Sequence, residues 1–118
     1  MYTCPCCGHE VFESPPGSFD ICPLCFWEDD FVQLYFPLQG GGANRCSLVE
    51  AQVSFVQFGA CERSMVKNVR PSTPEDRKDP LWFPLWERKV EVPDHESSSV
   101  RPQNESSVKR LCYWLRST

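Results

Sequence analysis

The stretch of sequence that decides the fold is TCPCCGHEVFESPPGSFDICPLCFWEDD, residues 3–30. It contains two Cys-x-x-Cys pairs, Cys4 with Cys7 and Cys22 with Cys25. Each pair can fold into a tight turn that directs two sulfurs at one ion, and four thiolates are a ligand set that suits tetrahedral Zn²⁺. The spacing therefore predicts one structural zinc ion in a closed Cys₄ site.

The residues around each pair favour tight, metal-directed turns. Pro5 and Pro23 follow the first cysteine of each pair, and proline stiffens a turn by fixing φ. Gly8, directly after the first pair, can adopt a positive φ that lets backbone N–H groups point at sulfur. Phe26 stands at the matching place after the second pair. We therefore expect the second turn to be strained or closed in a different way.

Two neighbouring side chains could enter the ligand set. Cys6 is a spare thiol that could replace Cys4 or Cys7, but only those two reproduce the spacing of the second pair. His9 follows the first pair, and with four cysteines available we expect it to be a hydrogen-bonding neighbour of the site.

Other uses of the paired cysteines stay open at this point. Structural disulfides need an oxidising compartment, and Met1 is followed almost at once by Cys4, without the basic and apolar regions of a signal peptide. A thioredoxin-like redox pair would open a helix within a βαβ unit. Iron could bind the same ligands in a rubredoxin-like site. We favour zinc over iron, and a cytoplasmic protein over a secreted one.

Two runs of sequence, YTCPCCGHEVFESPPGSFDICPLCFWEDD at residues 2–30 and GGANRCSLVEAQVSFVQFGACER at residues 41–63, resemble the cysteine-rich CPCC family of small bacterial proteins. The resemblance covers roughly Met1 to Leu81 and implies a compact metal-binding domain of bacterial, cytoplasmic origin. Some family members lie beside genes for polymorphic or contact-dependent toxins, which implies a role as an immunity protein. The tail beyond Leu85 departs from the family pattern.

The charge of the chain is divided unevenly along its length. Residues 1–60 contain seven acidic side chains and one basic one, and residues 61–118 contain nine acidic and eleven basic ones, within an overall charge of −4. Four thiolates on one Zn²⁺ would make the first part more negative still. Nucleic-acid affinity depends on basic patches, so this distribution argues against a nucleic-acid-binding ribbon. No apolar run approaches the ~20 residues that cross a membrane.

The segment between the two cysteine pairs has the pattern of a short hairpin. Residues 10–13 alternate enough to form a strand, residues 14–17 (Ser-Pro-Pro-Gly) signal a turn, and residues 19–21 return as a second strand. The expected order is knuckle, strand, turn, strand, knuckle, as in a zinc ribbon. Residues 31–36 are apolar and aromatic, and we expect a third strand or an extended segment there.

One helix is strongly indicated and a second is expected after it. Ser47 can N-cap a helix over residues 48–58, Glu50 completes a capping box, and Gly59 fits the C′ position. Valines widen the apolar face of that helix, which predicts burial on two sides. A shorter helix is expected over residues 61–69. The predicted fold is small α+β, with a zinc-ribbon-like hairpin and its Cys₄ site packed on one or two α-helices.

Residues 26–30, Phe-Trp-Glu-Asp-Asp, can be interpreted in two ways. In one, the aromatic residues cover the metal cluster while the carboxylates face water. In the other, Trp27 anchors an exposed acidic patch of Glu28, Asp29 and Asp30, a composition that meets a basic partner at an interface. The second interpretation is our hypothesis for a partner-binding surface.

The chain divides into a metal-binding domain, residues 1–86, and a polar tail, residues 87–118. The aromatic run at residues 81–86 either caps the core or forms an exposed patch, and we favour the core. Residues 93–107 have the composition of a disordered linker. Residues 108–115 fit either a short terminal helix or a strand.

No catalytic constellation is recognisable, and a closed Cys₄ site has no open position for chemistry. We expect a non-enzymatic zinc-binding module that binds another protein. The resemblance and the acidic first half favour an immunity protein that neutralises a cognate toxin or another basic protein. The alternatives are a nucleic-acid-binding zinc ribbon and a thiol redox or metal-relay protein that uses Cys6. No membrane partner is expected.

Overall fold

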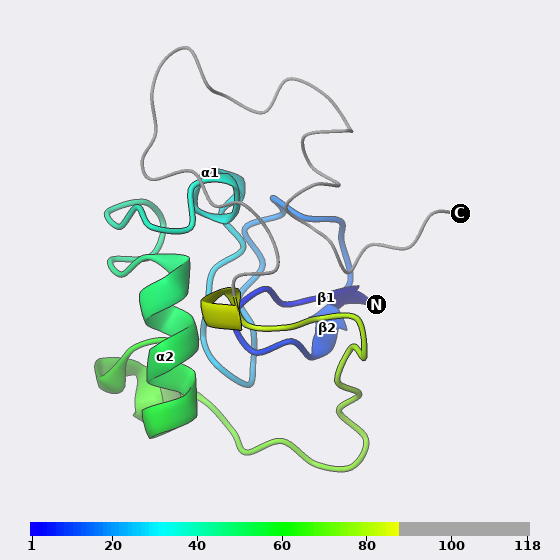
Figure 1. Ribbon diagram of the computed structural model, residues 1–118. Coiled ribbons are helices and arrows are strands. Elements are labelled where there is room, and N and C mark those ends of the chain that lie inside the picture. Colours follow the sequence, from blue (N-terminus) through cyan, green and yellow to red (C-terminus); the bar gives the residue numbers. More distant parts are fainter. Residues whose placement is uncertain (88–118) are drawn as a thin grey trace.

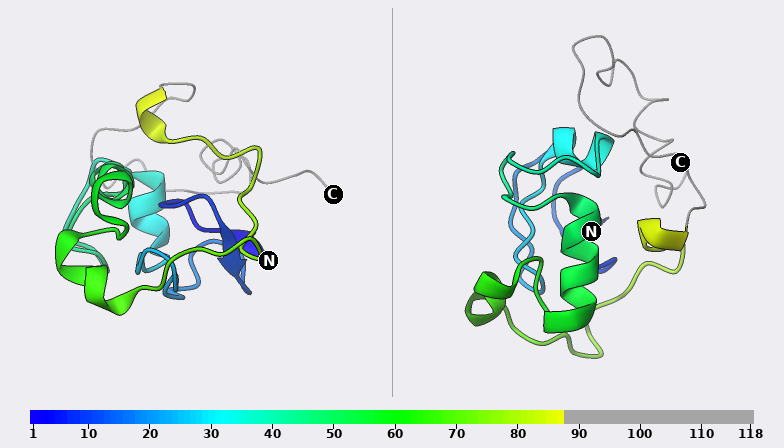
Figure 2. Two further views of the ribbon diagram at one scale, coloured as in Figure 1. Left: turned by 90° about the horizontal axis from the view of Figure 1, so that it is seen from below. Right: turned by 60° about the vertical axis from the view of Figure 1, so that its left-hand side comes forward.

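The computed structural model describes residues 1–87, and the expectations for residues 93–107 and 108–115 lie outside this range. Figures 1 and 2 show α2 on one side of the described chain and the small sheet on the other. None of the helices within residues 1–87 is long and apolar enough to cross a membrane. The elements in chain order are β1 (Tyr2–Thr3), β2 (Glu10–Phe12), α1 (Phe31–Tyr35), α2 (Leu48–Phe58), and the 3₁₀ helices η1 (Arg63–Asn68) and η2 (Leu85–Glu87).

The sheet is an antiparallel hairpin that surrounds the first cysteine pair. β1 and β2 pair with Tyr2 opposite Phe12, and an irregularity separates this pair from the next. The strand predicted at residues 10–13 is present as β2. The prediction of a second strand at residues 19–21 that pairs with it is wrong. Phe19 adopts a φ of 61°, which interrupts an extended strand, so this segment contributes only a single bridge between Ile21 and Glu28.

Residues 31–35 form a short helix, α1, and the expected strand or extended segment is wrong. Asp30 explains the difference, because its Oδ1 accepts hydrogen bonds from the backbone N–H groups of Val32 and Gln33. These N–H groups are among those that a helix start leaves without intrahelical partners. The N-cap thus overrides the strand preference of the aromatic and β-branched residues that follow.

The predicted capping box of α2 is confirmed. The Ser47 hydroxyl accepts from Glu50 N–H, the Glu50 carboxylate accepts from Ser47 N–H, and Gly59 ends the helix with a φ of 83°. The prediction that α2 is buried on two sides is wrong, because Val53 and Val56 are exposed. The following helical segment is present as η1, a 3₁₀ helix shorter than predicted.

One hydrophobic core contains the paired cysteines and residues from every layer of the fold. Leu48 and Ala51 of α2 pack in this core with the cysteines, and Leu85 of η2 joins them. Trp82 packs against the same core, whereas Leu81 and Trp86 are exposed, so the run at residues 81–86 is divided between core and surface. The prediction of a small α+β fold with an N-terminal hairpin and a cysteine cluster is confirmed.

Candidate metal centre

Four cysteine sulfurs come together in the centre of this core. The Sγ atoms of Cys4, Cys7, Cys22 and Cys25 all lie within 4.8 Å of one another, and all four residues are buried. Cys4 Sγ is 3.6 Å from Cys25 Sγ, and Cys7 Sγ is 3.8 Å from Cys22 Sγ. A tetrahedral ion with Zn–S bonds of ~2.3 Å separates its sulfur ligands by about 3.8 Å. The donor set and its spacing therefore fit a tetrahedral metal ion.

The first pair lies in a turn of residues 4–9, which we call the first knuckle. Gly8 N–H donates to the Cys4 carbonyl at 2.8 Å, and Cys4 N–H donates to the His9 carbonyl at 2.9 Å. Gly8 adopts a φ of 80°, a left-handed conformation that glycine accepts without steric cost. These two hydrogen bonds close the turn with both sulfurs on its inner side.

The second pair lies in a turn of residues 22–27, the second knuckle, which repeats the hydrogen bonding of the first. Phe26 N–H donates to the Cys22 carbonyl at 2.8 Å, and Cys22 N–H donates to the Trp27 carbonyl at 2.9 Å. Phe26 has a φ of 69°, close to that of Gly8, so the turn closes in the same way and not in a different one. The expected strain is therefore located at Phe26, because a non-glycine residue pays for this conformation.

Residues from distant parts of the chain hold the first knuckle. Gln52 Nε2 on α2 donates to the Pro5 carbonyl at 2.9 Å, and its Oε1 accepts from Leu85 N–H at 2.8 Å. Trp82 Nε1 donates to the same Pro5 carbonyl at 3.0 Å. A Cβ atom built on Gly8 would lie 2.5 Å from the Trp82 ring, so the indole covers the turn closely. Neither Gln52 nor Trp82 was predicted to support the site.

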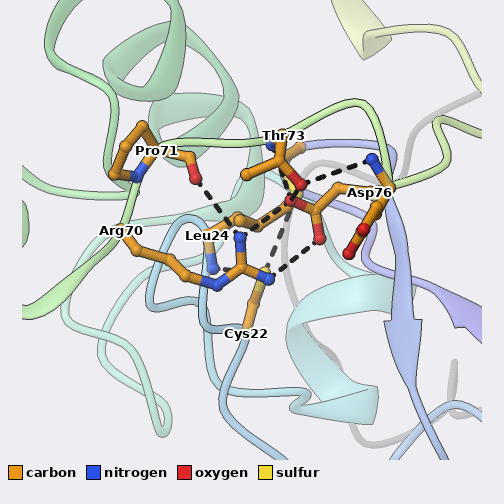
Figure 3. Close-up of polar contacts among 8 residues, drawn as sticks. Cys22, Leu24, Arg70, Pro71, Thr73 and Asp76 are labelled. Atoms are coloured by element: carbon orange, nitrogen blue, oxygen red, sulfur yellow. Dashed lines mark hydrogen bonds and ion pairs between the residues drawn. The ribbon is translucent and has the colours of Figure 1, made fainter.

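The second knuckle is held by the chain that follows α2. Cys61 N–H donates to the Cys25 carbonyl at 2.7 Å, and Arg70 N–H donates to the Pro23 carbonyl at 3.2 Å. Figure 3 shows the Arg70 guanidinium beside this knuckle, paired with both carboxylate oxygens of Asp76 at 2.8 Å. The segment that covers the second knuckle is thus fastened by its own ion pair.

The thiols of the cluster differ in how readily they lose a proton. Burial raises the pKa of Cys4 and of Cys25 well above the ordinary value. Hydrogen bonds from Cys22 and Cys25, with a smaller contribution from His9, hold the pKa of Cys7 well below it. Its contact with Cys7 raises the pKa of His9, but His9 Nδ1 is a buried atom without a hydrogen-bond partner among residues 1–87, so the expected hydrogen-bonding role of His9 stays a prediction. A metal ion that binds here must therefore displace protons from buried thiols. The affinity of the site for the metal should decrease as the pH is lowered.

The other described cysteines lie outside the four-sulfur set. Cys6 is buried, and burial raises the pKa of its thiol. It occupies the same place in the first knuckle that Leu24, equally buried, occupies in the second. Burial also raises the pKa of Cys46 to about 11 and that of Cys61 further. Every cysteine within residues 1–87 is a free thiol, so the disulfide interpretation has no support in this part of the chain.

The acidic patch expected at residues 27–30 does not form. Trp27 is 0% exposed, Asp29 1% and Asp30 7%. Asp29 Oδ2 accepts hydrogen bonds from the turn at residues 17–18, and Asp30 caps α1. Only Glu28 keeps an accessible side chain, at an intermediate exposure. The local pattern of two aromatics and three acids did not distinguish carboxylates that face water from carboxylates that satisfy buried backbone N–H groups.

Comparison with known proteins agrees with the geometry of the cysteines. A family model described as cysteine-rich CPCC matches residues 2–76, which is more than half of the chain and includes both knuckles. A search of curated proteins found no match. The chain therefore belongs to the cysteine-rich CPCC family.

Proposed function

We propose that this protein is a non-enzymatic zinc-binding module in which a single structural Zn²⁺ joins the two knuckles. The observation that supports this proposal is the burial of the whole donor set, since each of the four cysteines is at most 1% exposed. A catalytic zinc site keeps one position open for water or substrate, whereas a structural site closes all four. Binding energy in such a site is folding energy, because the unfolded chain has no preformed cluster.

The identity of the metal can be tested directly. Four thiolates also suit iron, so the proposal requires elemental analysis of the protein purified without added metal. We expect one equivalent of zinc and no visible absorption from iron. An equivalent of iron, or no metal at all, would contradict the proposal.

The structural role can be tested by removing the metal. Strong chelation should abolish the near-UV circular dichroism of the native protein, because tertiary structure depends on the ion. Cys46→Ser is a matched control, since this cysteine is half-buried and lies outside the four-sulfur set. We expect Cys46→Ser to retain one zinc ion per chain and a native-like spectrum. A native spectrum after full chelation would show that the ion is dispensable for folding.

We propose further that the module acts by binding another protein, and that this partner is a cognate bacterial toxin. The support is the resemblance to a family with members encoded beside toxin genes, together with the acidic character of residues 1–60. The test is co-purification with the product of the neighbouring gene, alongside DNA and RNA binding at several salt concentrations. Binding to that product and protection of cells that express it would support the proposal. Salt-sensitive nucleic-acid binding without a protein partner would favour the nucleic-acid-binding alternative.

A further inference from the structure

A pocket of about 420 Å³ opens on the outer side of the second knuckle. It lies where this knuckle meets the loop before α2 and the chain that leads into η1. Its lining includes an aromatic ring, two aliphatic or thioether side chains, two thiols and a carboxylate, from Phe26, Ile21, Met65, Cys46, Cys61 and Glu28. The pocket is separate from the four-sulfur cluster but shares its supporting turn.

Much of the apolar wall of the pocket comes from the second knuckle and the residue before it. Ile21 directly precedes Cys22 and is 47% exposed, and Phe26 directly follows Cys25. Phe26 retains a left-handed backbone that costs a non-glycine residue about 1–2 kcal/mol. Gly8 holds the equivalent place in the first knuckle, so glycine is sufficient to close such a turn. The phenyl ring therefore adds something that turn closure does not require, namely an aromatic wall beside an open pocket.

The backbone of Glu28, which carries the carboxylate at the rim, is held in a fixed position. Glu28 N–H donates to Asn44 Oδ1 at 2.9 Å, and Asn44 Nδ2 donates to the Glu28 carbonyl at 2.8 Å. Asn44 is itself buried and fixed by Gln33, whose Oε1 accepts from both nitrogens of Asn44 at 3.0 Å. The main chain at this edge of the pocket is therefore already ordered before a ligand binds, which lowers the entropy cost of binding.

The charges around the pocket leave one carboxylate uncompensated. Glu62 also lines the pocket, but it is paired with Arg45. Glu28 has no ion-pair partner within residues 1–87. Arg45 is the only basic residue among the lining residues. A ligand that brings a cation to Glu28 while it buries an apolar group against Phe26 would be complementary in both respects.

We propose that this pocket is where the module binds its protein partner, and that it takes an apolar side chain next to a basic residue. This inference rests on the proposed function as a protein-binding module. Of the predicted acidic patch, only Glu28 belongs to the proposed binding surface. The apolar part of that surface is formed by Ile21, Phe26 and Met65. Because Ile21 and Phe26 flank Cys22 and Cys25, we expect the pocket to be lost when removal of the metal unfolds the second knuckle.

The test uses two dipeptides that differ mainly in charge. Acetyl-leucyl-arginine amide and acetyl-leucyl-citrulline amide have nearly the same shape, but citrulline is neutral. Each is titrated into the zinc-loaded full chain, and the methyl resonances of Ile21 and Met65 are followed by NMR. We expect saturable shifts confined to the pocket, with about three- to tenfold tighter binding of the arginine peptide at low salt. Scattered or absent shifts, or equal affinities, would overturn the proposal.

Matched variants locate the charge effect. Glu28→Gln should remove the preference for arginine over citrulline, whereas Glu13→Gln should keep it, because Glu13 is exposed and lies outside the pocket lining. Phe26→Gly should weaken both peptides while zinc content stays at one per chain, since glycine accepts the positive φ. Ile21→Ser tests the same wall if the glycine variant does not fold. Equal behaviour of the two glutamine variants would contradict the assignment.

The failure of this inference can be distinguished from the failure of the proposed function. If the neighbouring-gene product binds Glu28→Gln and Phe26→Gly as tightly as it binds the native protein, then the module has a partner but uses another surface. If that product does not bind even the zinc-loaded native protein, then the toxin-binding function itself is refuted. If it binds the native protein and loses at least about tenfold in affinity with Phe26→Gly, both are supported.

Discussion

The two knuckles have the same backbone and opposite surroundings. In each, the residue after the second cysteine is left-handed, and its N–H donates to the carbonyl of the first cysteine at 2.8 Å. The first knuckle is contacted directly by Gln52 and Trp82, two residues that lie far from it in the sequence. The second knuckle brings its own aromatic residues, with Trp27 in the core and Phe26 beside a pocket.

This difference explains which residue each turn can tolerate after its second cysteine. Gly8 lies against the Trp82 indole, so a side chain there meets an obstacle in addition to backbone strain. Phe26 experiences similar backbone strain, but its ring has space in which to lie. The same backbone hydrogen bonds close both turns, and the neighbouring surface decides which residue can follow the second cysteine. Substitutions at matched positions of the two knuckles test this difference.

The largest effect should come from removing one ligand from either knuckle. Cys7→Ser and Cys22→Ser should each lose the zinc ion and most tertiary structure, because both sulfurs belong to one closed site and the ion contributes to folding. Metal content and near-UV circular dichroism provide the measurement. If only one of the two variants unfolds, the two knuckles do not contribute equally. The variant that stays folded must then hold the ion with its three remaining cysteines.

The next largest effect should distinguish the middle residues of the two turns. Leu24→Ala should lower the free energy of unfolding by about 2–5 kcal/mol, because it leaves a cavity in the core. Cys6→Ala removes a single sulfur atom and should cost about 1 kcal/mol or less, with zinc retained. Denaturant unfolding of the zinc-loaded variants measures both. Loss of zinc from Cys6→Ala would mean that this thiol serves as a ligand.

A smaller effect is expected when a methyl group is added to Gly8. Gly8→Ala should destabilise by at least about 1–2 kcal/mol through the left-handed backbone, with an additional cost because its Cβ would meet the Trp82 ring at 2.5 Å. Gly59→Ala is the matched control: its φ is 83° and no atom lies within 4 Å of the added Cβ. The difference between the two variants measures the indole contact. Equal losses would show that Trp82 moves aside without cost.

The smallest effect concerns the ion pair beside the second knuckle. The Arg70 guanidinium holds the pKa of Asp76 well below its usual range, so the stabilisation is complete above the ordinary Asp pKa of about 4 and is lost as pH falls below it. Asp76→Asn should therefore be slightly less stable than the native protein, by a constant amount from pH 8 to pH 5. Thermal unfolding of zinc-loaded samples measures this difference. A difference that disappears between pH 7 and pH 5 would point to another group.

The local parts of the structure could be predicted from the sequence. The four sulfurs follow from the spacing of two pairs, and α2 follows from Ser47, Glu50 and Gly59, all of which act within a few residues along the chain. The short helix α1 was missed, although a signal was present. Asp30 and Gln33 have the spacing of an N-cap and its third helical residue, and this outweighs the strand preference of Phe31 and its neighbours.

The parts that could not be predicted depend on contacts between distant residues. Gln52 reaches a carbonyl 47 residues earlier, and Trp82 reaches the same carbonyl from 77 residues away. Nothing in the periodicity around either residue indicates such a partner. The burial of Asp29 has the same origin, because its hydrogen-bond donors lie 11 and 12 residues earlier.

The order in which the chain is synthesised gives the Trp82 contact a kinetic consequence. Both knuckles are complete by residue 27, and the sulfurs of Cys7 and Cys22 are separated by only 15 positions, so the ion needs to close only a short loop. Trp82 is synthesised much later, and we expect it to cover a turn that has already folded. We expect an ion that binds early to be enclosed in this way, and its exchange with free metal to require that the hydrogen bonds of Trp82 and Gln52 to the Pro5 carbonyl open first. Metal exchange should consequently follow the rate of local unfolding and not the intrinsic lability of zinc–thiolate bonds.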